Sequence, residues 1–345
     1  MKKTLLLALF LFSLAVPALA LDLGDSAPEI SPETWITGEP ADPTKTDDKT
    51  FYLVEVWSVT CPPCVRSIPI MNELQKRYAD QGFKIVSFTT DTEDEVKEFL
   101  DDHPMEYSSF IDKEGETMIR YMAADNRNTI PHAFLFDKSG ALVWIGNPLD
   151  NLEARVKEVL SGKLNRERAV AVRDAKEGLQ VAFESQNIEG MLSSLKELED
   201  LEPDNSQYYQ LHYRIMTELG FGDDTDIRDL FAAWYEGSKD QAESLAILSM
   251  VAMDQGPASQ RNPELALAAA KRSFELDSPA QIKVQAGLNL ADVYKAIGRI
   301  DLALDTLKET SKIAESDQMG TISDIEDFYL RMKKLGENPD AEYKP

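Results

Sequence analysis

Residues 51–64 of the 345-residue chain read FYLVEVWSVTCPPC, and the organisation of the first half of the chain follows from them. The first seven of these residues are almost all apolar, as expected of a buried strand in a parallel sheet. Two cysteines, Cys61 and Cys64, follow at the carboxyl end of this strand, and a helical pattern runs from Val65 to Asp80. The sequence therefore predicts a cysteine pair at a strand-to-helix junction.

Strands and helices alternate on both sides of this junction. Further strands are predicted over residues 84–90, 107–111, 133–137 and 141–145, and further helices over 92–102, 114–122 and 149–160. The last two strands form a hairpin around Lys138, Ser139 and Gly140. This alternation predicts an α/β domain with a mainly parallel sheet and an antiparallel edge.

The second half of the chain has a different pattern, with no period-2 strand signal after Ser161–Lys163. Predicted hairpin turns fall near Asn187, Asp224, Asn262 and Arg299, at spacings of 37, 38 and 37 residues. A tetratricopeptide repeat has about 34 residues, and the spacing of Leu290, Tyr294, Gly298, Ala303 and Leu307 is similar to that of such repeats. We therefore expect two domains, an α/β domain over 21–162 and a tetratricopeptide-like helical-hairpin solenoid over 166–345. The solenoid offers a docking or dimerisation surface, or it is an appendage that stabilises the first domain.

The N-terminus has the pattern of a secretory signal peptide. Lys2 and Lys3 precede an apolar run from Leu5 to Val16, and Ala18–Ala20 reads as an A-x-A cleavage site. The apolar run is shorter than the roughly 20 residues of a spanning helix, although an uncleaved anchor is the alternative. We expect cleavage after residue 20, a periplasmic or otherwise extracytoplasmic location, and no membrane insertion of the mature chain.

Charge and cysteine content exclude several classes of protein. Lys and Arg total 36 and Asp and Glu total 61, a net charge of −25. Such a charge disfavours sequence-independent nucleic-acid binding and adsorption to anionic lipid. Two cysteines are too few for a disulfide scaffold or, alone, for a four-ligand zinc site. The histidines do not have the spacing of a zinc finger; they are His103, His132 and His212. We expect a redox-active Cys61–Cys64 disulfide, without metal or cofactor.

The motifs of the first half resemble those of TlpA/ResA-type thiol–disulfide oxidoreductases, which have the thioredoxin fold and belong to the redoxin/AhpC-TSA superfamily. The resemblance covers roughly residues 21–162. It rests on the segment WSVTCPPC at Trp57–Cys64, on GDSAP at Gly24–Pro28, on Pro69 in the helix, on Thr129-Ile130-Pro131 before a strand, and on the additional strand and helix near 107–122. It implies a cis-proline facing the cysteines and an activity in disulfide exchange.

Placement at the start of a helix makes Cys61 the expected nucleophile, because the positive end of the helix dipole lowers a thiol pKa. Cys64, one turn further along, is expected to be buried and to resolve the mixed disulfide. Glu55 lies six residues before Cys61 and matches the buried acid of thioredoxin, so we expect it to handle protons, with a pKa raised by burial. An exposed Glu55 is the alternative. Ser67 occupies the position at which TlpA-like proteins often have a glutamate.

Five further residues are expected to support the site or bind substrate. Trp57 packs beside the cysteines, Pro62 and Pro63 rigidify the turn, and Ile130 and Pro131 form the segment opposite the cysteines. Among other polar residues, His132 is either a proton shuttle or an ordinary strand residue. Asp91 and Asp137, at strand ends, are interpreted as turn formers.

The sequence thus predicts an extracytoplasmic enzyme that reduces protein disulfides. Its expected partners are protein disulfide or thiol clients and an electron donor in the membrane or of thioredoxin type. One alternative is a redox-inert scaffold acting through the solenoid. A thiol peroxidase is disfavoured, because its P-x-x-x-T-x-x-C pattern fails: counting back from Cys61 gives Ser58 and Val54.

Overall fold

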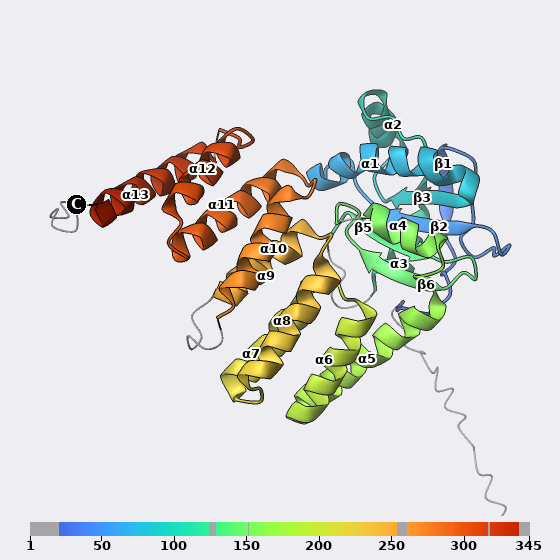
Figure 1. Ribbon diagram of the computed structural model, residues 1–345. Coiled ribbons are helices and arrows are strands. Elements are labelled where there is room, and N and C mark those ends of the chain that lie inside the picture. Colours follow the sequence, from blue (N-terminus) through green and yellow to red (C-terminus); the bar gives the residue numbers. More distant parts are fainter. Residues whose placement is uncertain (1–20, 124–128, 151, 254–260, 317, 338–345) are drawn as a thin grey trace, which may run out of the picture. The chain divides into compact units, whose positions relative to one another are not determined.

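The computed structural model describes residues 21–123, 129–150, 152–253, 261–316 and 318–337 (Figure 1). The chain divides into two compact units, one ending at Arg173 and the other beginning at Asp174. The predicted signal peptide lies outside the described residues. Within the described part of the chain, no helix combines the length and apolar character needed to cross a membrane.

The first unit contains a six-stranded sheet in the order β1-β4-β3-β2-β5-β6. Its strands are β1 (Pro32–Thr37), β2 (Phe51–Val56), β3 (Phe83–Thr89), β4 (Ser108–Asp112), β5 (His132–Phe136) and β6 (Leu142–Gly146). The central strands β2, β3 and β4 are parallel, and β1, β5 and β6 pair antiparallel. The predicted α/β fold, of thioredoxin-like type, is confirmed.

The edge strand β1 was not predicted. Its sequence, PETWIT, mixes polar and apolar residues without a clean alternation, and most of its residues are only half-buried. It pairs antiparallel with β4 through an irregular register with two shifts, between Pro32 and Thr34 and between Trp35 and Thr37. A period-2 test cannot detect a strand whose register is interrupted twice.

Four helices lie between or after the strands of this sheet along the chain. They are α1 (Pro62–Tyr78), α2 (Glu93–Asp102), α3 (Glu116–Met122) and α4 (Leu152–Leu160). Two short 3₁₀ helices, η1 (Ala79–Gln81) and η2 (Lys113–Gly115), join them to strands. Helix α1 begins at Pro62, earlier than the predicted Val65. The reason is that Pro62 and Pro63 stand in the first turn, where a missing N–H costs nothing. Cys61 therefore caps the helix.

Helix α5 (Arg166–Glu184) begins in the first unit. The guanidinium of Arg173 donates to the Leu23 carbonyl at 3.2 Å, and the Arg166 N–H donates to Asp137 at 3.1 Å. Ala169 and Val172 are buried. The first unit thus extends further along the chain than the expected domain, which ends at residue 162.

The described residues of the second unit form helices joined by short turns and loops. Its helices are the end of α5, then α6 (Ile188–Leu201), α7 (Ser206–Leu219), α8 (Asp224–Ser238), α9 (Ala242–Met253), α10 (Pro263–Glu275), α11 (Ala280–Ala296), α12 (Ile300–Ser311) and α13 (Met319–Glu337). From α6 onward each helix packs on the next. The predicted turns fall at helix starts: Asn187, Asn262 and Arg299 are N-caps, and the cap of α8 is Asp223, adjacent to Asp224. The assignment to tetratricopeptide-like repeats stays a prediction.

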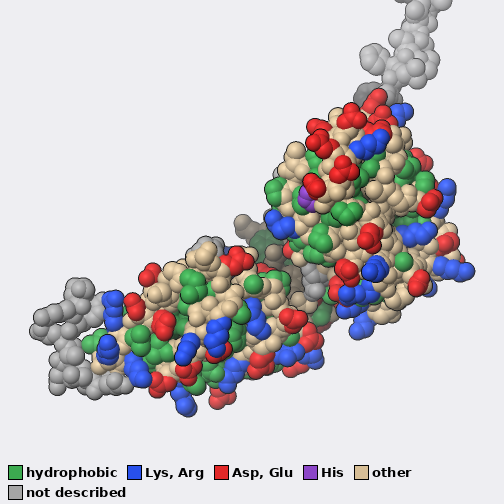
Figure 2. Space-filling view, turned by 90° about the horizontal axis from the view of Figure 1, so that it is seen from above, with side chains coloured by type: hydrophobic (Ala, Val, Ile, Leu, Met, Phe, Trp, Pro, Cys, Tyr) green, Lys and Arg blue, Asp and Glu red, His purple; other side chains and the backbone are tan. Residues whose placement is uncertain are grey.

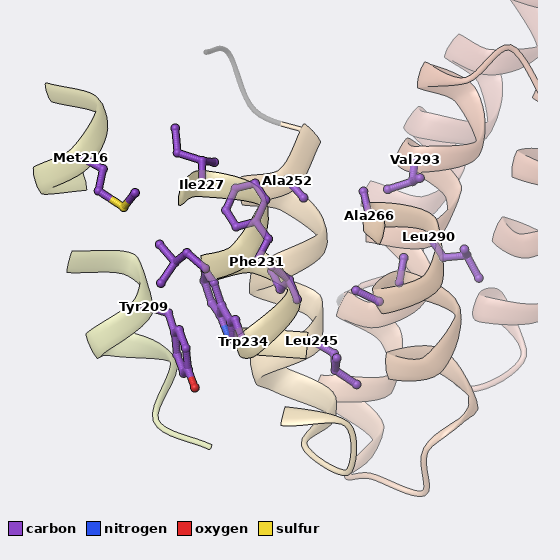
Figure 3. Close-up of a cluster of buried hydrophobic side chains, with 14 residues drawn as sticks. Tyr209, Met216, Ile227, Phe231, Trp234, Leu245, Ala252, Ala266, Leu290 and Val293 are labelled. Atoms are coloured by element: carbon purple, nitrogen blue, oxygen red, sulfur yellow. The ribbon is translucent and has the colours of Figure 1, made fainter. Parts of the chain in front are cut away.

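The core of this unit is continuous across several helices (Figure 3). Trp234 of α8 stacks on Tyr209 of α7 with ring centroids 5.5 Å apart, and its indole N–H donates to Ser244 at 2.9 Å. Phe231 and Leu245 are fully buried in the same cluster. On the face of the molecule seen in Figure 2, acidic and basic side chains are interspersed over the surface. Each hairpin therefore buries its apolar face against its neighbours.

Candidate functional site

The cysteine pair lies where the first residues of α1 follow the carboxyl end of β2, as predicted. Cys61 and Cys64 are joined by a disulfide, with Cα atoms 5.2 Å apart. Cys61 is 8% exposed and Cys64 only 1% exposed. An incoming sulfur atom therefore reaches Cys61 more easily than Cys64.

Cys61 is the N-cap residue of α1. The main-chain N–H of Cys64 donates to Cys61 Sγ at 3.2 Å. Pro62 and Pro63 carry no N–H, so Cys64 provides the first main-chain donor of the helix that can reach this sulfur. The donor and the positive end of the helix dipole together stabilise negative charge on Cys61 Sγ.

A cis peptide bond joins Ile130 and Pro131, as the resemblance implies. The Ile130 carbonyl oxygen lies 3.6 Å from Cys61 Sγ, so this segment faces the exposed end of the disulfide. Pro131 is buried and Ile130 is half-buried. His132 is the first residue of β5 and pairs with Val56, and its ring centroid lies 5.2 Å from that of Phe134. The structure does not assign His132 a part in the chemistry.

Glu55 lies in the middle of β2, between Ser87 of β3 and Ala133 of β5. Its side chain is 1% exposed, so the alternative of an exposed carboxylate is wrong. Oε1 accepts a hydrogen bond from Ser67 Oγ at 2.9 Å. Burial raises the pKa of Glu55 to about 8, and the bond from Ser67 opposes part of that rise. Glu55 is therefore mostly protonated near neutral pH.

Among the described residues, the groups that set the pKa of Glu55 include the Ser67 hydroxyl and no charged side chain. Ser87, which pairs with Glu55 across β2 and β3, donates to Ser109 Oγ at 2.9 Å. Tyr107, just before β4, is buried close enough for Glu55 to help raise its pKa, behind the larger effect of desolvation. The protonation of Glu55 is thus governed by burial and by Ser67.

Trp57 and the two prolines frame the cysteines. Trp57 is buried, and its ring centroid lies 5.6 Å from that of Phe99 in α2. Pro62 is exposed and Pro63 half-buried. Pro62 is accordingly the proline that a client could contact, whereas Trp57 fixes α2 against the end of β2.

Asp91 is the residue whose position the sequence interpretation undervalued. Its Oδ2 accepts from the Val59 N–H at 2.7 Å and from the Thr89 hydroxyl at 2.8 Å, and Oδ1 accepts from Ser58 Oγ at 3.1 Å. It therefore holds the loop directly before Cys61 and is more than a turn former. The carboxyl ends of adjacent parallel strands share one sheet edge, so the order of β2 and β3 carried a signal for this contact.

Comparison with known proteins gives the following relatives. A family profile described as Redoxin matches residues 22–160. Thioredoxin-like protein YneN of Bacillus subtilis is 31% identical over 123 residues, which cover 34% of this chain and 68% of the relative. Thiol-disulfide oxidoreductase ResA of Bacillus thuringiensis is 33% identical over 88 residues, 25% of this chain and 49% of the relative. The chain thus spans about half the length of such ResA relatives.

A solved structure described as a putative thiol:disulfide interchange protein DsbE from Chlorobium tepidum is 25% identical. The match covers 41% of this chain and 99% of that one, with a TM-score of 0.35. The names of the sequence relatives agree with the class of enzyme predicted from the cysteine motif.

Proposed function

Because the chain belongs to the thioredoxin-like Redoxin family, we propose that it is a thiol–disulfide oxidoreductase that uses Cys61 and Cys64. The observation that carries this proposal is the position of the Cys61–Cys64 disulfide. It lies at the start of α1, with the cis Ile130–Pro131 peptide on its exposed side and a buried carboxyl group nearby. We infer that it acts as a reductase of protein disulfides.

The first step begins from the dithiol form. The Cys61 thiolate attacks one sulfur of a client disulfide, the client S–S bond breaks, and the other client sulfur leaves as a thiolate. The product is a mixed disulfide between Cys61 and the client. The Cys64 N–H, 3.2 Å from Cys61 Sγ, supports the attacking charge before the bond forms.

In the second step Cys64 resolves the mixed disulfide. Glu55, in its ionised form, takes the Cys64 thiol proton, and the Cys64 thiolate attacks Cys61 Sγ. The client sulfur leaves as a thiolate, so the client gains two electrons and the Cys61–Cys64 disulfide forms. A dithiol donor, in the membrane or of thioredoxin type, must then supply two electrons to restore the starting state.

The targeting pattern of the first 20 residues supports an extracytoplasmic place for this cycle, where protein disulfides persist. Fractionation of the expressing cells, followed by N-terminal sequencing of the protein from each fraction, tests this part of the proposal. A mature N-terminus at Leu21 supports it, and an intact Met1 contradicts it.

The helical unit is proposed to dock clients or partners. A groove of about 560 Å³ runs between α9 and α11 and reaches the start of α13. Its lining is part apolar and part amide, with Ile247, Met250, Gln285, Asn289 and Gln318 among its residues. Such a lining can hold both the side chains and the main chain of a polypeptide segment.

The decisive experiment is reduction of insulin by the dithiothreitol-regenerated full-length chain, with the double variant Cys61→Ala/Cys64→Ala as control. Acceleration by the wild type alone supports an oxidoreductase. Equal rates would favour the redox-inert scaffold instead. The reduction potential of the Cys61–Cys64 pair then separates a reductase, with a low potential, from an oxidase.

A further inference from the structure

Ser67 lies between the two groups that the proposed mechanism uses in its second step. Its side chain is fully buried on α1. Its Oγ is 2.9 Å from Glu55 Oε1 and 2.8 Å from the main-chain oxygen of Cys64. The other Glu55 oxygen, Oε2, has no hydrogen-bond partner among the described residues.

A hydroxyl group carries a single hydrogen, so Ser67 cannot donate to both acceptors at once. An ionised carboxylate accepts a stronger hydrogen bond than a peptide carbonyl does. Ionised Glu55 therefore attracts the Ser67 hydrogen. When Glu55 is protonated its attraction weakens, and the Cys64 carbonyl competes for the same hydrogen.

We propose that Ser67 is a positioning residue whose hydroxyl turns from the Cys64 carbonyl to Glu55 when Glu55 ionises. The charge of Glu55 is thereby linked to the first turn of α1, which carries Cys64. This inference rests on the proposed function only for its role in catalysis; the hydrogen-bond exchange itself can be measured without turnover.

Within the proposed cycle, the Ser67 hydroxyl changes its hydrogen-bond acceptor in a fixed order. Before resolution, the bond from Ser67 stabilises the carboxylate that accepts the Cys64 proton. Oε1 is held by Ser67, which leaves Oε2 as the oxygen that receives the proton. After the transfer, Glu55 is neutral and Ser67 returns to the Cys64 carbonyl. In this step the S–H bond of Cys64 breaks and an O–H bond of Glu55 forms. No other covalent bond changes.

Among the residues that the structure describes, no other titratable group close to Glu55 could produce this pH-dependent change at the Cys64 carbonyl. Cys64 does not titrate while it is in the disulfide. The pKa of Tyr107 is raised well above its ordinary value, first by burial and then by the charge of Glu55. The facing residues of β3 and β5, Ser87 and Ala133, are neutral.

The test uses the oxidised full-length protein with ¹³C-labelled cysteine carbonyls. NMR then shows two carbonyl resonances, and Cys61 serves as the internal control. The Cys64 resonance is expected to shift with pH, with a midpoint near the Glu55 pKa of about 8, while Cys61 moves much less. The pH dependence of the Cys64 carbonyl resonance should vanish in Glu55→Gln and in Ser67→Ala. It should persist in Ser67→Thr. A Cys64 resonance that does not titrate in the wild type overturns the proposal.

A kinetic test adds the link to catalysis. Ser67→Ala removes a hydrogen bond to a carboxylate, so the pH midpoint of disulfide exchange should rise by about one unit. Ser67→Thr should restore the midpoint, and Ser67→Ala should add nothing to Glu55→Gln in the double variant. Unchanged kinetics in Ser67→Ala overturn the catalytic part. The Cys64 carbonyl resonance could titrate as expected while neither the wild type nor any variant reduces a disulfide. In that case the proposed function fails, and the proposed change of hydrogen-bond acceptor at Ser67 is retained.

Discussion

Asp91 binds the main-chain N–H of Val59 at 2.7 Å, and this bond joins the end of β3 to the loop that leads into Cys61. The same carboxylate also accepts from Thr89 and Ser58. The Ser58 hydroxyl in turn accepts from the Thr60 N–H at 3.2 Å. The segment between β2 and the nucleophile is thus held by one side chain from the loop that follows the neighbouring strand β3.

We expect Asp91→Ala to lower the rate of disulfide exchange and to destabilise the first unit by about 1–3 kcal/mol, the usual cost of leaving such hydrogen-bond partners unpaired. Asp91→Asn keeps an acceptor oxygen, so its losses of exchange rate and of stability should be smaller than those of Asp91→Ala. Urea denaturation and reduction of a small aromatic disulfide measure the two effects.

Asp137 offers a matched control, since it accepts hydrogen bonds from the main-chain N–H groups of Ser139 and Ala141 in the hairpin between β5 and β6. Asp137→Ala should reduce stability with little change in rate; equal rate losses in both variants would contradict a specific role for Asp91.

Cys61 is expected to form the mixed disulfide with clients. It is the more exposed sulfur and it stands at the N-cap of α1, whereas Cys64 is almost completely buried. Cys64→Ala should therefore accumulate a covalent client complex that reductant releases, and Cys61→Ala should not. Non-reducing electrophoresis after client addition shows the complex. Faster alkylation of Cys64 than of Cys61 in the reduced wild type would reverse the assignment.

Glu55→Gln is expected to slow resolution of that complex by roughly 100-fold, a typical contribution of a general base. With a pKa of about 8, the wild-type carboxylate fraction grows between pH 6 and pH 9, so the resolution rate should rise over that range. The Gln variant should lack this part of the rise. Stopped-flow release of a small thiol from a preformed mixed disulfide isolates the step. Identical pH profiles for the two proteins would remove Glu55 from the chemistry.

The same carboxyl should make the first unit less stable as pH rises. Its pKa is raised from an ordinary value of 4.5 to about 8, so the folded state holds a proton that the unfolded state has lost. The free energy of unfolding therefore falls between about pH 4.5 and pH 8, by roughly 5 kcal/mol if the whole shift is realised. Glu55→Gln stays neutral, so it should match the wild type near pH 5 and be more stable at pH 8.

An exposed glutamate of α1 provides the control for that comparison. Glu73 is exposed, and its carboxylate lies 3.9 Å from the guanidinium of Arg77. Glu73→Gln should follow the wild type across the pH range. If the gap between Glu55→Gln and the wild type does not widen from pH 5 to pH 8, the carboxyl does not carry the expected burial penalty.

The parts of this site that could be predicted are those fixed by local pattern. An apolar strand followed by C-P-P-C places Cys61 at a helix start, and the resemblance to thioredoxin, with its buried acid six residues before the first cysteine, implied that Glu55 is buried. Asp91 was undervalued because its partner, Val59, is a neighbour only through the pairing of β2 with β3. Likewise, the hydrogen bond from Ser67 to Glu55 depends on how α1 packs across the sheet, which sequence spacing does not give.

In the helical unit, too, features set by local sequence could be predicted, and features set by tertiary packing could not. Turn residues with a capping side chain, such as Asn187 and Asn262, mark the start of a helix locally, because the side chain bonds main-chain N–H groups a few residues later. The first residues of α5 could not be assigned to a unit in this way. Their apolar residues have helical spacing, but only the packing of Ala169 and Val172 shows which core they join.

The last prediction concerns client docking by the groove between α9 and α11. Met250 lines this groove and is 48% exposed, so Met250→Glu changes its surface without emptying a core. In the Cys64→Ala background this change should reduce the amount of protein client captured as a mixed disulfide, since a docking surface raises the local client concentration at Cys61. The rate of Met250→Glu with a small disulfide, measured with both cysteines present, should be unchanged. Leu219, 52% exposed at the end of α7 and outside the lining of this groove, supplies the control variant Leu219→Glu. Capture that falls equally in both variants points to a general loss of solubility, and capture that falls in neither shows that the groove does not select clients.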